Sequence, residues 1–99
     1  MTGVAAALAV LAGVAASDAA CCAAVKFRPR GQAHREAVKV VEAISLEGPA
    51  MAKELERLLS AKDQAHYGLH ALPKPKALPL LAAASRLVDL ASAVVARYP

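Results

Sequence analysis

The chain has 99 residues, the length of one domain, and we expect a single domain over residues 1–99. Hydrophobic residues make up 58% of it, and Phe27 is its one phenylalanine. The formal net charge of +4 suits an acidic partner such as nucleic acid, but small soluble proteins often carry as much. The composition excludes several classes of site, because the chain has no glycine-rich phosphate loop, no CxxC motif and too few aromatic residues to stack single-stranded bases.

The first 25 residues are mostly apolar and resemble the core of a secretion signal. No Lys or Arg precedes them, and Asp18 interrupts them before the roughly 20 apolar residues that a membrane span needs. We therefore expect a cytoplasmic protein with no membrane contact, and export with cleavage near Ala20 is the minority alternative. The segment is predicted to be a buried core helix from Thr2 or Gly3 to about Lys26. Its shared face holds Leu8, Leu11, Ala12, Ala15, Asp18 and Cys22.

Three further helices follow, because apolar residues recur at helical spacing between proline and glycine breaks. We expect them at about residues 32–45, 49–65 and 77–97, with Pro49 in the first turn of the middle one and a loop over residues 66–76. Glu54 and Arg86 are expected to face water, and Glu54 has the spacing to pair with Arg57. The stripes expected to face the core are Ala33, Ala37, Val38, Val40, Val41 and Ile44; Met51, Leu55, Leu58 and Leu59; and Leu80, Leu81, Ala84, Leu87, Val88, Ala91, Val94 and Val95.

These elements predict an all-α fold, a four-helix up-down bundle with short loops. A core of Ala, Val and Leu buries little area per residue, so we expect a homodimer or a bound partner. A disulfide between the adjacent Cys21 and Cys22 would be strained, so we expect none. We interpret both cysteines as small buried hydrophobes in a reducing compartment. Histidines 66 and 70 are separated by the helix-breaking Gly68, so we expect no metal site, and we expect no cofactor.

The candidate chemistry lies at the junction after the first helix, where Arg28 and Arg30 precede His34. Cleavage of RNA by its own 2′-hydroxyl needs a proton acceptor, a proton donor and a cation beside the phosphate. A histidine can supply the proton transfer and an arginine can clamp the phosphate, beside a helix start that adds partial positive charge. The candidate catalytic residues are thus His34 and Arg28, and the candidate nucleic-acid-binding residues are Arg28, Arg30 and Arg35. The alternative is a solvated basic loop beside a helix start.

Asp18 is the third candidate catalytic residue, because a carboxylate in an apolar helix needs a partner. It can pair with Arg28, Arg30 or His34 and so orient the histidine, as carboxylates often do. The alternatives are a structural salt bridge or a turn of the helix that reaches water.

Three stretches, Ala12 to Cys22, Arg30 to Ala37 and Lys62 to Tyr67, resemble segments of the helical HEPN-like proteins of bacteria. Small actinobacterial members have a similar alanine-rich helix, an Asp, a basic loop and a Gly-Gln-x-His helix start. The resemblance covers roughly residues 10–70. It implies a helical bundle that dimerises. Many members are metal-independent endoribonucleases, often toxins paired with a nucleotidyltransferase antitoxin, and others bind substrates or nucleotides without cutting RNA.

The family's catalytic motif is an arginine followed, after four to six residues, by a histidine, and Arg28 and His34 match that spacing. The chain departs from the family pattern at Pro29, where a polar residue is common, and in the early position of the motif. The resemblance implies that RNA is the substrate and a nucleotidyltransferase antitoxin a partner. A non-catalytic interaction or dimerisation module is the alternative function.

Overall fold

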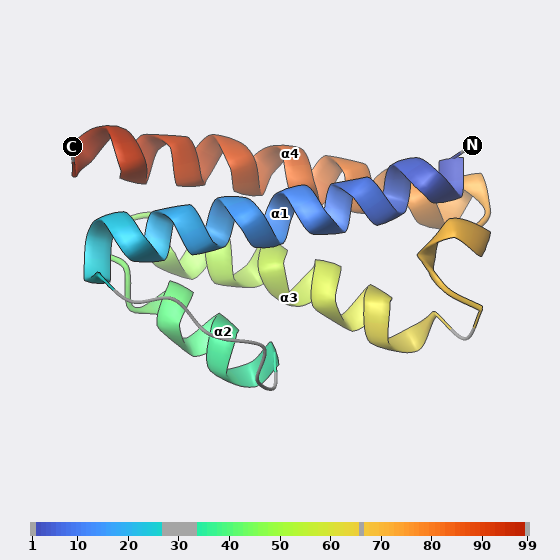
Figure 1. Cartoon of the computed structure of the whole chain (residues 1–99), viewed down its shortest axis with the longest axis horizontal. Helices are drawn as coiled ribbons and strands as arrows, with labels where there is room; N and C mark the ends of the chain where they lie inside the picture. Colours follow the sequence, from blue (N-terminus) through green and yellow to red (C-terminus); the bar gives the residue numbers. More distant parts are fainter. Residues whose placement is uncertain (1, 27–33, 66, 99) are drawn as a thin grey trace.

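The computed structural model describes residues 2–26, 34–65 and 67–98, and its secondary structure in these ranges is entirely helical (Figure 1). The four helices are α1 (Thr2–Val25), α2 (His34–Glu42), α3 (Gly48–Gln64) and α4 (Lys74–Arg97), and a short 3₁₀ helix, η1 (Leu69–Ala71), precedes α4. The described ranges contain no β-strand. The predicted all-α fold and helical bundle are therefore confirmed.

The helix ends follow local backbone chemistry. α3 begins with Pro49 in its first turn, as predicted. α4 begins at Lys74, three residues earlier than expected, because Pro75 is tolerated in a first turn, where its missing N–H has no helical partner. α2 ends at Glu42, three residues before its expected end, and Leu46 in the following turn adopts a left-handed φ of 70°.

The prediction that the four helices alternate in direction, up and down, was wrong. A side chain at Gly3 would meet the backbone of His70, just before α4, and one at Gly13 would meet Leu87 in the middle of α4, so α1 and α4 run in the same direction. α3 runs opposite to α4, because Glu47 beside its start bonds Arg97 at the end of α4. Figure 1 shows α1 and α4 side by side and α2 and α3 as a hairpin, of which α3 packs against both α1 and α4.

The core lies where α1, α3 and α4 meet, and the α2–α3 hairpin closes one end of it. Most of the stripes predicted for the last three helices are confirmed, and Ile44, Met51, Leu55, Leu58, Leu87 and Val94 are fully buried. Val88 and Val95 were expected in the core and are instead exposed at its edge. Ala33 lies outside the described residues.

The buried face predicted for α1 was also wrong. Leu8 and Leu11 are 60% and 65% exposed, and Ala12, Ala15 and Cys22 are exposed with them. α1 is apolar on all sides, so its periodicity does not select a face. Packing selects the small residues, which let α1 approach its neighbours closely, and leaves the leucines outside. The residues that α1 buries are Gly3, Ala6, Ala9, Val10, Gly13, Ser17, Ala20 and Cys21.

Candidate functional site

The structure places only part of the predicted catalytic set. Asp18 is half-buried in the second half of α1, Arg35 is exposed on α2, and His34 is the first residue of α2. Arg28, Arg30 and the side chain of His34 lie outside the described residues. The convergence of these groups on one phosphate therefore stays a prediction.

The two adjacent cysteines lie in opposite environments. Cys21 is a fully buried free thiol, whereas Cys22 is exposed, so the prediction of two buried cysteines was right only for Cys21. Burial, together with the negative charge of the nearby Asp18, raises the pKa of the Cys21 thiol to about 11. Cys21 is therefore a neutral core side chain at physiological pH, unsuited to nucleophilic chemistry.

We expect a maleimide to modify Cys22 quickly in dilute, folded protein at neutral pH and to leave Cys21 unmodified. Cys21 is both inaccessible and protonated, and only a thiolate is nucleophilic. Mass spectrometry of the single variants provides the check, with one fast adduct for Cys21→Ala and none for Cys22→Ala. Equal rates for the two thiols would contradict the burial of Cys21.

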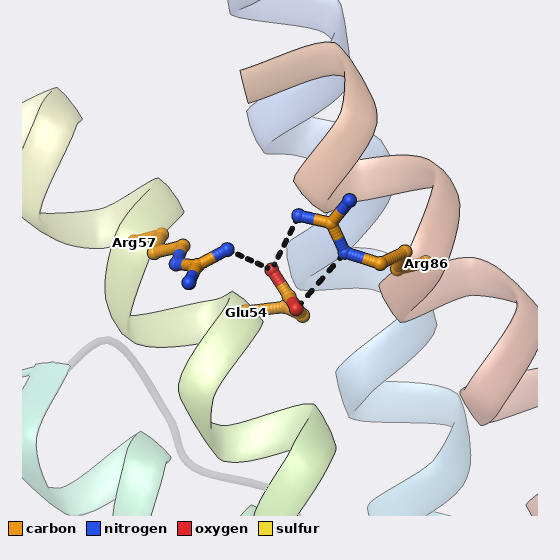
Figure 2. Close-up of polar contacts among 3 residues, drawn as sticks. All are labelled: Glu54, Arg57 and Arg86. Carbon is orange, nitrogen blue, oxygen red and sulfur yellow. Dashed lines mark hydrogen bonds and ion pairs between the residues drawn. The ribbon is translucent and has the colours of Figure 1, made fainter. Parts of the chain in front are cut away.

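A buried carboxylate joins α3 to α4. Glu54 is 8% exposed and accepts a two-pronged bond from Arg86, from Nε at 3.0 Å and from Nη2 at 3.2 Å (Figure 2). Arg57, one turn further along α3, donates from Nη1 to the same carboxylate at 3.3 Å. The hydrogen bonds and the charge of Arg86 hold the pKa of Glu54 below its usual range, with smaller contributions from Arg57 and Lys53.

The Glu54–Arg57 pair was predicted, but the long-range bond to Arg86 was missed, and Glu54 does not face water as expected. The sequence contains a signal for this burial. Glu54 lies three residues after Met51 and four before Leu58, which places it on the flank of the buried stripe of α3. A charge at such a position needs a partner from a neighbouring helix.

Arg97 at the end of α4 bonds to the turn between α2 and α3. Arg97 donates from Nη1 to Glu47 at 2.8 Å and from Nη2 to the carbonyl oxygen of Ser45 at 3.1 Å. Its guanidinium carbon also lies 5.1 Å from the ring centre of Tyr98. The bond to Arg97 lowers the pKa of Glu47. The Glu54 and the Glu47 ion pairs both join elements that are distant in sequence, and we interpret their role as structural.

We expect acid to lower the free energy of unfolding, because it protonates the carboxylates of Glu47 and Glu54. The folded pKa values of Glu47 and Glu54 lie below the unfolded value of about 4.3, so the unfolded chain binds protons first as the pH falls. We expect urea-unfolding stability to be nearly constant from about pH 5 to 8 and to fall below about pH 4.3. Glu54→Gln should cost about 1–3 kcal/mol at pH 7 and progressively less as the pH falls.

The matched control is Glu56→Gln, because Glu56 lies on the same helix and is exposed. At pH 7 it should unfold within about 0.5 kcal/mol of the wild type, because Glu56 is at the surface and a glutamine can still accept the hydrogen bond that Ser60 donates to it. A Glu54→Gln variant that keeps the full acid sensitivity of the wild type would contradict the part assigned to Glu54.

The remaining feature is an uncovered apolar surface, which we call the outer face of α1. Its members lie within one sector of the helix and are all exposed. In Figure 1 no other helix lies over α1. The outer face of α1 consists of Val4, Leu8, Leu11, Ala12, Ala15, Ala19 and Cys22.

Two helices, α1 and α4, are long and apolar enough to cross a membrane by length and composition. The core helices of soluble proteins pass the same test, as do signal sequences, so the expected cytoplasmic location stays a prediction. Among the residues that the structure describes, no three His, Cys, Asp or Glu side chains gather as a metal centre would require.

Comparison with protein-family models, with curated proteins and with solved structures gave no match to this chain. The all-α bundle is thus established by the structure itself, while the HEPN-like assignment continues to rest on the short sequence stretches that carry the resemblance.

Proposed function

We propose that this protein is a helical interaction module that docks a partner through the outer face of α1. The observation that carries the proposal is the exposure of Leu8 and Leu11 on a helix that buries mostly small residues, among them Gly13, Ser17 and Ala20. Scattered exposed leucines are ordinary, but a continuous apolar stripe along a helix of 24 residues is typical of an interaction site.

The distribution of charge supports the same proposal. α1 carries one charged residue, Asp18, whereas α2 carries four in nine residues and α3 six in seventeen. If the outer side of α1 contacted only water, we would expect it to carry charge, as the outer sides of α2 and α3 do. The outer face of α1 therefore has the composition of a buried surface.

Site-specific photo-crosslinking in the native cells tests the proposal. A photo-reactive amino acid in place of Ala15, in the outer face of α1, should form protein adducts. The same residue in place of Lys62, which is exposed on α3, is the matched control and should form few or none. No adduct at position 15, or equal adducts at both positions, would overturn the docking role.

A second candidate function is that of a HEPN-like RNA- or nucleotide-associated protein acting as a metal-independent endoribonuclease. It is favoured by the start of α2 at His34, since a helix start offers free N–H groups and partial positive charge to a phosphate. In this proposal His34 is the general acid/base, Arg28, Arg30 and Arg35 hold the phosphate, and Asp18 orients the histidine. A nucleotidyltransferase antitoxin would then be a partner.

Cleavage of a mixed RNA pool in EDTA tests this second candidate. The wild type should cut, His34→Ala should not, and His70→Ala should cut normally, because His70 is an exposed histidine in η1 and serves as the matched control. No cleavage by the folded wild type would exclude the endoribonuclease.

A further inference from the structure

The apolar surface continues from α1 onto α4. Arg86 reaches toward α3, and helix geometry places Val88 and Val95 on the opposite side of α4. Val88 and Val95 each follow a buried alanine of α4, Ala84 and Ala91, by four residues, so they lie at the edge of the buried stripe away from α3. They are 37% and 42% exposed, and α1 packs against the same stripe, so we group this flank of α4 with the outer face of α1 and call the two together the two-helix layer.

We infer that this two-helix layer is the interface with a second copy of the chain, packed about a two-fold axis. The inference rests on the proposed docking role of the outer face of α1 and names its partner. Over the whole of α1 and α4, the charged residues are Asp18, Lys74, Lys76, Arg86, Asp89 and Arg97. Arg86 and Arg97 bond carboxylates outside the layer, and Lys74 and Lys76 lie in the first turn of α4, so the middle of the layer carries little charge. Such a nearly uncharged surface is complementary to a copy of itself, as a two-fold interface requires.

The dimensions of the layer also fit a dimer. A helix of 24 residues is about 36 Å long and about 10 Å wide, so α1 alone presents about 360 Å². A stable interface buries about 800 Å² on each partner, which one helix does not reach but two adjacent helices approach. The molecule is only 17 Å deep along its shortest axis, and a second copy would thicken this shallow core.

A lipid bilayer fits the layer less well. α3 packs beside α1 and α4 and has six charged residues, so a membrane-spanning form of this fold would bring those charges into hydrocarbon. A helix that binds an anionic membrane surface usually carries Lys and Arg on its polar face, and α1 has neither residue. An interface with a second copy of the chain leaves the charges of α3 in water and needs no Lys or Arg on α1.

Light scattering after size exclusion tests the inference on the full chain between about 1 and 100 µM. The wild type should have twice the chain mass. Leu8→Gln with Leu11→Gln should weaken dimerisation about 100-fold or more, because each leucine is buried twice in a two-fold dimer. Leu46→Gln is the control, since Leu46 is 81% exposed and lies outside the layer; it should dimerise normally. Circular dichroism should be the same for the wild type and both variants.

Two further measurements identify the surface. Val88→Gln with Val95→Gln should also weaken the dimer, and dimerisation unaffected by this change would overturn the contribution of α4. The alkylation rate of Cys22, which lies in the outer face of α1, should fall as wild-type concentration rises and stay constant in the Leu8/Leu11 variant.

A monomeric wild type, or a dimer unaffected by the Leu8/Leu11 change, would overturn the inference. In that case adducts at position 15 to another protein would leave the docking role intact, whereas no adducts would remove it too. Flotation with vesicles of phosphatidylcholine and phosphatidylglycerol, dependent on Leu8 and Leu11, would overturn the second-copy inference in favour of lipid.

Discussion

Leu87→Ala is expected to lower the free energy of unfolding by about 3 kcal/mol, within the range for a fully buried leucine. Leu87 lies in the middle of α4 and faces Gly13 of α1, so its removal leaves a cavity between the two helices. For a domain of this size each kcal/mol lost lowers Tm by about 4–8 °C. Urea and thermal unfolding followed by circular dichroism measure the effect.

The matched control is Leu78→Ala on the same helix, because Leu78 is half exposed. It should cost no more than about 1 kcal/mol, since little area returns to water and no cavity forms. Both variants should be unfolded at two protein concentrations, so that loss of a dimer is not mistaken for loss of the core. Equal costs for the two leucines would contradict the packing of α4.

Gly13→Val is expected to destabilise the fold by about 1–3 kcal/mol, although valine is the better helix former. A Cβ at this position would meet Cδ1 of Leu58 and would lie 3.3 Å from Cδ2 of Leu87. Both leucines are fully buried, so neither can move aside without disturbing the core. Chemical unfolding of the variant gives the cost directly.

Ala12→Val, at the neighbouring residue, is the control for the orientation of α1. Ala12 is exposed in the outer face of α1, so at protein concentrations that keep the chain monomeric this change should alter stability by about 0.5 kcal/mol, the loss of helix propensity. If Ala12→Val were the more damaging change, α1 would pack through its leucines and the outer face would be its buried side.

Much of the local structure follows from the sequence alone. The apolar periodicity of α3 places Met51, Leu55 and Leu58 in the core, and all three are fully or almost fully buried. Pro49 marks a helix start because its missing N–H is harmless in a first turn. These features depend on contacts within a few residues of one another, which a pattern can encode.

The candidate catalytic residues follow from the spacing of residues in the sequence, and they stay a prediction. Arg28 and His34 fit a phosphate-handling motif, and α2 begins at His34, but the three-dimensional relation of the two side chains is outside the described residues. The RNA cleavage test therefore addresses a prediction made from sequence.

The sequence by itself determined the helical class of the protein, the position of its four helices and the core stripes of α3 and most of α4. Only the tertiary structure decided the direction of the helices, the face that α1 buries and the pairing of Glu54 with Arg86. The reason is physical. An Ala-rich helix that is apolar on every side has no preferred face of its own, and the neighbour that approaches it most closely selects the small residues and leaves Leu8 and Leu11 outside.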